Sequence, residues 1–226
     1  MNSTRPKTCA VIAAAGKSTR MSISGSKQFI EIGGKTVIEK TITVFDSCSH
    51  IDEIIVAARA EDIEKIREIA VVAGLSKLKD VVAGGAARRE SVANAVAAVS
   101  GDMDFIAIHD GARCFVSHGD IEKVLFKAFE TGAAAAGTKV TDTIKTVGRS
   151  GKITGTPARE LLWAVQTPQI FAKDLYIEAL GKCENDVTDD CAVAERAGYT
   201  VCVVECSRYN IKITEAQDLE FIKGLL

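Results

Sequence analysis

The sequence predicts an α/β fold in which helices cover both faces of a mostly parallel, twisted sheet. Two observations carry this prediction: apolar, β-rich runs alternate with stretches of helical period, and the first strand ends in small residues. The chain has 226 residues, of which 47% are hydrophobic and 26% are charged. This length and composition suffice for one full core, so we expect a single domain over residues 1–226.

The first elements follow a β-α-β order. Thr8–Ala14 and Glu53–Ala58 are short apolar runs rich in β-branched residues, which predicts strands. Glu61–Ala73 carries apolar residues at intervals of three and four, which predicts a helix. A helix between two such strands is the usual connection in a parallel sheet.

The same alternation continues to the end of the sequence. Further strands are predicted at Lys79–Ala83, Asp104–His109, Ala133–Thr138 and Thr200–Glu205, and further helices are predicted to start near Arg88, Gly119, Lys173 and Asp189. A last helix is expected from Thr214, because Thr214 and Gln217 have the spacing of a capping box. We expect this helix to pack on the sheet.

One segment, residues 141–157, breaks the alternation. It is rich in Thr, has little apolar content and carries a turn signal at 148–151. These features predict a protruding β-hairpin arm inserted in the domain. Because an exposed arm of this kind commonly finds a partner surface, we expect a homodimer.

Composition and charge exclude several classes of protein. A net charge of -2 gives no polybasic surface for nucleic acid, and no apolar run is long enough to span a membrane. The seven cysteines are scattered without a CxxC pair, which argues against a disulfide framework or a zinc site. The first residues lack a secretory signal. We therefore expect a cytoplasmic protein that binds small molecules and contacts neither membrane nor nucleic acid.

The end of the first strand, Ala14-Ala15-Gly16, is followed by two cations, Arg20 and Lys27. Ligands of open α/β sheets bind at the carboxyl ends of the strands, where small residues let backbone N–H groups approach phosphate oxygens. Fixed cations beside such a loop suit phosphoryl or nucleotidyl transfer, because negative charge develops on the transferred group. Neither a GxGxxG motif nor P-loop spacing is present. Taken alone, the segment also fits an ordinary loop with solvated cations.

Two further strand ends carry residues suited to chemistry. Asp110 follows an apolar strand, where it can either hold a hard cation such as Mg²⁺ against phosphate oxygens or cap a turn. Its neighbour His109 fits a buried hydrogen-bonding role better than that of a base. The stretch Gly84–Ser91 repeats the pattern of strand, glycines and helix start, which suits a base or ribose. Ser91 itself is either a ligand contact or an ordinary polar residue of a first helical turn.

Taken in order, these motifs resemble those of the 2-C-methyl-D-erythritol 4-phosphate cytidylyltransferases of the non-mevalonate isoprenoid pathway. The shared motifs run nearly end to end: AAAGKSTRM, SKQF, GG-x-x-R-x-x-S, HDGAR, DTIK at 142–145, WAVQTPQ at 163–169, VTDD at 187–190 and NIKIT at 210–214. The resemblance implies a Rossmann-like nucleotidyltransferase fold and an enzyme in which the substrate phosphate attacks the α-phosphate of CTP. It also implies a requirement for Mg²⁺ and a homodimer whose arms embrace.

The resemblance further implies roles for individual residues. Arg20 and Lys27 would stabilise the transition state at the α-phosphate, and Arg159 and Lys212 would orient the attacking phosphate, with Arg159 entering the neighbouring active site. The CTP site would be lined by Ala14, Ala15, Gly16, Gly85, Ser91 and Gly111, and Asp110 would serve the Mg²⁺ region. Methylerythritol phosphate would face Asp110, Arg113, Thr143, Thr167 and Thr188.

Some positions depart from the resemblance, and two other functions stay open. Ala86 stands where many members carry Asp, Gly111 where Ala is common, and Cys114 where Pro is usual. The chain could instead be a cytidylyltransferase for another alditol phosphate such as ribitol 5-phosphate, or a non-catalytic nucleotide-binding module. Asp189 and Asp190 are interpreted as structural acids of a first helical turn.

Overall fold

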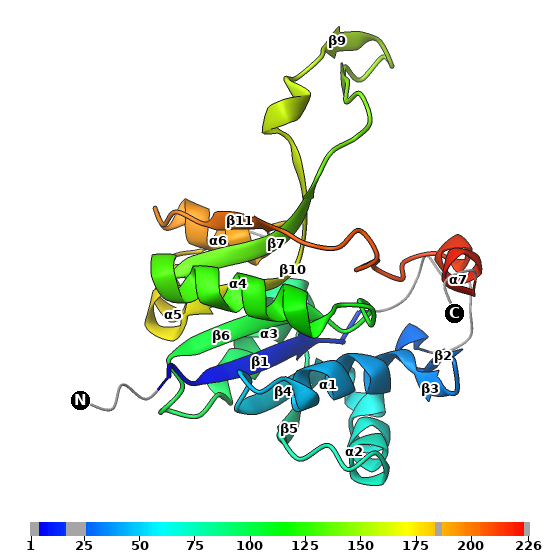
Figure 1. The fold of residues 1–226 in the computed structure, drawn as a ribbon, viewed down its shortest axis with the longest axis vertical. Helices are drawn as coiled ribbons and strands as arrows, with labels where there is room; N and C mark the ends of the chain where they lie inside the picture. Colours follow the sequence, from blue (N-terminus) through cyan, green and yellow to red (C-terminus); the bar gives the residue numbers. More distant parts are fainter. Residues whose placement is uncertain (1–4, 17–25, 184–186, 224–226) are drawn as a thin grey trace.

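A seven-stranded sheet forms the centre of the fold (Figure 1). In this computed structural model, residues 5–16, 26–183 and 187–223 are described. From one edge to the other, the strands are β11 (Cys202–Glu205), β7 (Ala133–Lys139), β10 (Trp163–Ala172), β6 (Phe105–Asp110), β1 (Thr8–Ala13), β4 (Glu53–Ala58) and β5 (Leu78–Ala83). Only β10 runs antiparallel to its neighbours, β6 and β7. The predicted mostly parallel sheet is confirmed.

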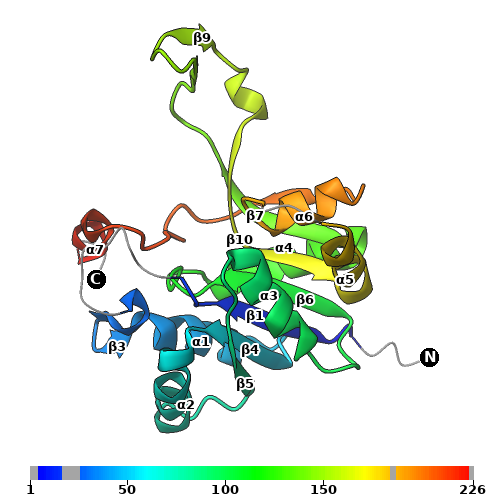
Figure 2. The ribbon, with the colours of Figure 1, turned by 180° about the vertical axis from the view of Figure 1, so that it is seen from behind.

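Helices cover both faces of this sheet, as the sequence predicts (Figures 1 and 2). The helices of one face are α1 (Val37–Ser47), α2 (Ile63–Val72) and α4 (His118–Thr131), and those of the other face are α3 (Arg88–Ala97), α5 (Lys173–Lys182) and α6 (Asp190–Arg196). Alternate residues of β1 enter the two cores: Ile12 packs with the first set of helices and Val11 with the second. None of the described helices is long and apolar enough to cross a membrane.

The longest elements that the sequence analysis did not predict are the helix α1 and the strand β10. The α1 helix has a recognisable start, because the Thr36 hydroxyl accepts a hydrogen bond from the Glu39 N–H at 3.2 Å. Strand β10 contains Pro168 near its middle, which argues against a central strand when only the sequence is read. The strand accommodates Pro168 where its register with β7 shifts, between Val165 and Gln169.

The last helix, α7 (Ala216–Lys223), differs from the expectation in two ways. Asp218, not Gln217, caps the turn, because its carboxylate accepts hydrogen bonds from the N–H groups of Thr214 and Glu215 at 2.6 and 2.8 Å. The helix does not pack on the sheet, so that prediction is wrong. Its buried Ile222 belongs to a separate small cluster with Ile32, Val37, Ala112, Cys114 and Ile213. Through Ile32, this cluster includes the small hairpin formed by β2 (Glu31–Ile32) and β3 (Lys35–Thr36).

An arm leaves the sheet between β7 and β10 (Figure 1). Its tip is an antiparallel pair of short strands, β8 (Thr146–Val147) and β9 (Ile153–Gly155), and a single 3-10 turn, η4 (Arg159–Leu161), leads back to β10. Ile153 and Leu161 are 64% and 77% exposed. The arm therefore presents apolar side chains to solvent in the single chain.

Candidate functional site

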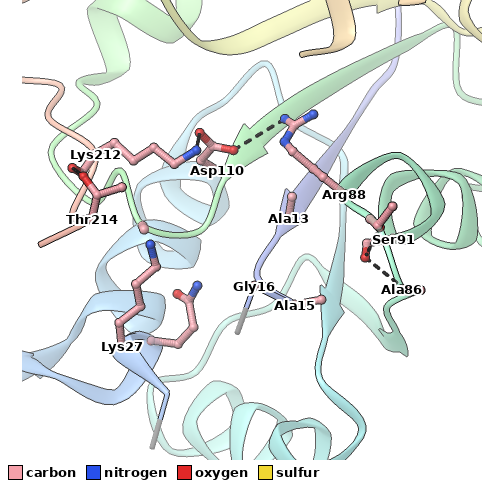
Figure 3. Close-up of a pocket in the computed structure, with 14 residues that line it drawn as sticks. Ala13, Ala15, Gly16, Lys27, Ala86, Arg88, Ser91, Asp110, Lys212 and Thr214 are labelled. Carbon is pink, nitrogen blue, oxygen red and sulfur yellow. Dashed lines mark hydrogen bonds and ion pairs between the residues drawn. The ribbon is translucent and has the colours of Figure 1, made fainter. Parts of the chain in front are cut away.

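A cavity of about 380 Å³ opens at the carboxyl ends of β1 and β6 (Figure 3). Small residues supply much of its wall, namely Ala13 at the end of β1, Ala15 and Gly16 after it, and Gly85, Ala86 and Ala87 before α3. Among the described residues, the charged side chains that line it are those of Lys27, Arg88, Asp110 and Lys212. This is the edge of the sheet at which the sequence predicts a phosphate-binding loop.

A smaller cavity of about 130 Å³ adjoins the first. Both cavities are lined by Arg88, Asp110 and Lys212, so these three charged residues form the boundary between them. The remaining wall comes from the loop after β6, the start of β10 and the segment before α6, through Arg113, Val165, Gln166, Thr167, Gln169, Thr188 and Asp189. Two molecules bound in the two cavities would meet at Asp110.

Asp110 is surrounded by cations. Its Oδ2 atom lies 2.8 Å from Lys212 Nζ and 3.5 Å from Arg113 Nε, and its Oδ1 atom lies 3.4 Å from Arg88 Nη2. Burial opposes ionisation of this carboxyl, but the three cations outweigh burial and hold its pKa well below the usual range. Asp110 is therefore a carboxylate at neutral pH.

Asp110 can contribute one carboxylate ligand to a Mg²⁺ site. Within the described part of the chain, no three His, Cys, Asp or Glu side chains come together as a metal-binding group. Mg²⁺ often binds one carboxylate and completes its octahedron with water and substrate phosphates. The Oδ1 atom is the better placed of the two, because its cation contact at 3.4 Å is longer than a charge-assisted hydrogen bond.

The segment before α7 holds two of the site's cations through its backbone. Lys27, in the 3-10 turn η2 (Lys27–Phe29), donates from Nζ to the Ile213 carbonyl at 2.7 Å. Arg113 donates from Nη1 to the Asn210 carbonyl at 2.7 Å. Lys212 belongs to this same segment, and both Lys27 and Lys212 border the larger cavity (Figure 3). The predicted catalytic residue Arg20 lies outside the described residues.

Ser91 organises the loop that forms one wall of the larger cavity. Its hydroxyl accepts a hydrogen bond from the Gly85 N–H and donates one to the Ala87 carbonyl, each at 3.0 Å. The Ala86 N–H donates to the Glu90 carboxylate at 2.8 Å. A Cβ at Gly85 would lie 2.3 Å from the Glu90 Cβ, so only glycine fits there. Ser91 thus both lines the cavity and shapes its wall.

Two residues expected to line the nucleotide site lie behind its surface. The Ala14 side chain is in the core, and its N–H donates to the Ala57 carbonyl at 2.7 Å. The Gly111 N–H donates to the Ala13 carbonyl at 2.9 Å, and a Cβ on Gly111 would lie 3.0 Å from the Ala14 Cβ. Neither residue is among those that line the cavity, and Ala14 and Gly111 are neighbours in the fold. Their assignment to the nucleotide site stays a prediction.

His109 is fully buried and hydrogen-bonded through both ring nitrogens. Its Nε2 atom lies 3.1 Å from the Arg113 carbonyl, which can only accept, so Nε2 carries the proton and Nδ1 accepts from the Thr167 hydroxyl at 3.1 Å. Burial lowers the pKa of the imidazole to about 4. His109 is therefore neutral at pH 7 and lines neither cavity.

The remaining predicted site residues divide into two groups. Arg113, Thr167 and Thr188 line the smaller cavity. Thr143 and Arg159 are exposed on the arm and line neither cavity, and Arg159 donates from Nη1 to the Thr141 carbonyl at 2.9 Å. A single chain thus does not bring these two residues to its own site.

Sequence reasoning missed Arg88, although it is the Arg of the quoted GG-x-x-R-x-x-S motif. Its guanidinium lies between Asp110 and Asp190, 2.7 Å from the Asp190 carboxylate. Asp190 lies in the first turn of α6, as the sequence predicts, and it forms this ion pair in addition. Asp189 does cap α6, because its carboxylate accepts from the Ala192 N–H at 3.0 Å. Gln28 and Thr214 also line the larger cavity without having been expected there.

Comparisons with known proteins agree on one family. The family model for 2-C-methyl-D-erythritol 4-phosphate cytidylyltransferase matches residues 8–226. A relative with that name from Alkaliphilus oremlandii is 40% identical over 224 residues, covering 97% of this chain and 95% of the relative. Another, from Halalkalibacterium halodurans, is 41% identical over 219 residues, covering 96% and 95%. The crystal structure of 4-diphosphocytidyl-2C-methyl-D-erythritol synthase from Anaerococcus prevotii superposes with a TM-score of 0.87 at 30% identity, covering 97% of this chain and 96% of that one.

Proposed function

We propose a mechanism from the premise that the chain belongs to the 2-C-methyl-D-erythritol 4-phosphate cytidylyltransferase family. The chain is accordingly a nucleotidyltransferase that joins CTP to methylerythritol phosphate, giving 4-diphosphocytidyl-2-C-methyl-D-erythritol and pyrophosphate. The resemblance seen in the sequence motifs is confirmed. The comparisons favour this activity over a ribitol 5-phosphate enzyme and over a non-catalytic nucleotide-binding module.

The observation that carries the mechanism is the pair of adjoining cavities. We assign CTP to the cavity of about 380 Å³ and methylerythritol phosphate to the cavity of about 130 Å³. The reacting groups would then meet at the boundary formed by Arg88, Asp110 and Lys212. This arrangement supports direct attack of the acceptor phosphate on the α-phosphate of CTP, because holding both groups at one boundary makes the encounter effectively intramolecular.

The cations assigned to the site act by charge and position. Lys27 and Arg20 stabilise the negative charge that develops at the α-phosphate, and Lys212 orients the attacking phosphate. No protein base is required, since the acceptor phosphate is already an anion. The neutral, buried state of His109 is consistent with this division of roles.

The walls of the two cavities select the substrates. The N–H groups of the loop at Ala15 and Gly16 and the loop held by Ser91, which includes Gly85, would receive the nucleotide. Ala14 and Gly111 contribute from beneath this wall. Arg113, Thr167 and Thr188 would contact the acceptor.

The metal assignment is limited to one carboxylate. Asp110 would hold Mg²⁺ through its carboxylate, beside the CTP phosphates in the proposed site. When bound, the ion neutralises phosphate charge and stabilises the leaving pyrophosphate. Lys212 on Oδ2 keeps the Asp110 carboxylate ionised and oriented for this role.

The arm supplies the last part of the site in our proposal. Thr143 and Arg159 are exposed and lie outside both cavities of their own chain, so we assign them to the active site of a second copy in a homodimer. The exposed apolar side chains of Ile153 and Leu161 would be covered by that copy. A cytoplasmic location stays a prediction from the sequence.

Pyrophosphate release tests the substrate assignment. With CTP, the purified protein should turn over 2-C-methyl-D-erythritol 4-phosphate at least about 100-fold more efficiently than ribitol 5-phosphate, by kcat/KM. Comparable turnover of both alditol phosphates would contradict the assignment of the smaller cavity to methylerythritol phosphate.

Mixing two inactive variants tests the shared site. In a dimer of one Arg159→Ala chain and one Lys27→Ala chain, one site contains both lesions and the other contains neither. After random subunit exchange, half of the dimers are mixed, so about a quarter of wild-type activity should return. No recovery despite exchange verified by mass spectrometry would mean that each site is built from one chain.

A further inference from the structure

We infer that Arg88 is a further phosphate-binding residue of this enzyme, and that Asp190 and Tyr176 are positioning residues that hold its guanidinium at the boundary of the two cavities. This inference rests on the proposed assignment of CTP to the larger cavity and the acceptor to the smaller one.

Arg88 is placed to reach both substrates. It is the first residue of α3, it lines both cavities, and it approaches Asp110 from the side opposite Lys212 (Figure 3). Both of its carboxylate contacts, to Asp190 at 2.7 Å and to Asp110 at 3.4 Å, use Nη2. A guanidinium carries five N–H donors in a planar fork. The fork can therefore be fixed at one corner by Asp190 while other donors bind phosphate oxygens, the geometry for which arginine is suited.

Asp190 is buried and is held through its N–H group and its Oδ1 atom, while its Oδ2 atom is in ion-pair contact with Arg88. It is 1% exposed, and its N–H donates to Gln169 Oε1 at 2.9 Å. Its Oδ1 atom accepts from the Tyr176 hydroxyl at 2.7 Å, while Oδ2 faces Arg88. Tyr176 is fully buried, with its ring stacked on Phe171 at a centroid distance of 4.8 Å. Tyr176 therefore has no access to substrate and can influence the reaction only through Asp190.

The chain Tyr176–Asp190–Arg88 is hard to explain by stability alone. A buried ion pair often contributes no more to stability than a well-packed apolar pair, because desolvating both charges is costly. Burial also opposes the charge of Arg88, but the Asp190 and Asp110 carboxylates outweigh it and raise the pKa of the guanidinium. The result is a permanently charged group with a fixed orientation. Such a group stabilises developing phosphate charge without reorganisation during the reaction.

The test compares two tyrosines whose hydroxyl groups are each influenced by a carboxylate. Tyr176→Phe removes the hydroxyl that holds Asp190 and keeps the ring. Tyr199→Phe is the control, because the Glu178 carboxylate raises the pKa of the Tyr199 hydroxyl and neither residue lines the two cavities. Asp190→Asn and Arg88→Gln complete the set. Steady-state kinetics for both substrates, calorimetric binding of CTP and thermal unfolding are measured for every variant.

We expect graded losses in kcat/KM for methylerythritol phosphate. Asp190→Asn and Arg88→Gln should each lower it by about 10-fold or more, and Tyr176→Phe by roughly 3- to 10-fold, whereas Tyr199→Phe should change it by less than about 2-fold. CTP should bind Arg88→Gln more weakly than wild type. In the Arg88→Gln background, Tyr176→Phe should have no further kinetic effect, because its influence passes through Arg88.

Two results would overturn the inference. One is a Tyr176→Phe variant that loses thermal stability but keeps kcat/KM within about 2-fold of wild type, as a purely structural tyrosine would. The other is a loss of kcat/KM caused by Tyr176→Phe that is as large in the Arg88→Gln background as in the wild-type enzyme. Lys212→Ala separates this result from the assignment of the cavities: a normal KM for methylerythritol phosphate in that variant would refute the assignment, whatever the outcome at Arg88.

Discussion

Acidification should destabilise this protein through His109. Burial lowers the pKa of its imidazole from 6.5 to about 4 in the folded state. Because the folded pKa lies below the unfolded value, the unfolded chain binds the proton first, and stability is lost as the pH falls from about 6.5 towards 4. At about 1.4 kcal/mol per pH unit, the loss from this residue approaches 3 kcal/mol at pH 4. The pKa of Asp110 is also lowered in the folded state. Protonation of Asp110 therefore reduces stability only when the pH falls below the ordinary pKa of that carboxyl, 3.8.

Urea unfolding between pH 7 and pH 4.5 measures this loss. His109→Gln keeps an N–H group that can donate to the Arg113 carbonyl and removes the titrating ring. The variant should be less stable than wild type at pH 7, yet its stability should fall less steeply below pH 6.5. His118→Gln is the control, because His118 is exposed on α4 and its replacement should leave the steep fall intact.

The same variant separates folding from chemistry at His109. If the imidazole serves only to hydrogen-bond the Arg113 carbonyl and the Thr167 hydroxyl, kcat of His109→Gln at pH 7.5 should stay within about 10-fold of wild type. Loss of a general base would lower kcat much further. An unchanged acid slope in His109→Gln would refute the burial argument. A loss of kcat by about 10³-fold or more with normal stability would instead make His109 catalytic.

Three further predictions concern the reaction itself. Excess EDTA should abolish turnover and Mg²⁺ should restore it, with Asp110→Asn raising the Mg²⁺ concentration needed; full activity in EDTA would remove the metal from the mechanism. Lys27→Ala and Arg20→Ala should each lower kcat by about 10²-fold with little change in Tm, and near-normal kcat in either would disprove that residue's role. Arg159→Lys should lower kcat/KM for methylerythritol phosphate by about 10-fold while the KM for CTP is kept, because lysine lacks the planar fork; equal losses for both substrates would contradict its assignment to the acceptor.

The parts of the fold that could be predicted have local signals. The β1, β4 and β6 runs are short, apolar and buried on both faces, so their pattern shows in the sequence. Strand β10 could not be recognised, because Pro168 lacks an N–H and the strand is kept in the sheet by its neighbours rather than by its own propensity. Helix α1 did have a signal, the Thr36 cap followed by Ile38, Ile42 and Phe45 at helical spacing.

The site divides in the same way. Asp110 is the last residue of β6, and Gly85 lies two residues after β5. Parallel strands bring their carboxyl ends to one edge, so sequence reasoning can place these residues together. The contact of Arg88 with Asp190 joins residues from helices α3 and α6, which have no local relation in the chain. Ala14 shows the opposite limit: the residue is next to the cavity in sequence, but the direction of its side chain and N–H depends on pairing with β4.

The single antiparallel strand explains why the arm and the site lie at the same edge. Strand β7 runs parallel to β6 in the sheet, so it ends at the edge where Asp110 ends β6, and the arm departs from there. Strand β10 returns in the opposite direction and therefore begins at that edge, which brings Gln166 and Thr167 into the wall of the smaller cavity. Had β10 been parallel, the arm would have to return to the far edge of the sheet. In the proposed dimer, contacts that a partner makes with the arm are thus connected directly, through β10, to the Thr167 hydroxyl that accepts from the Asp110 N–H at 3.0 Å.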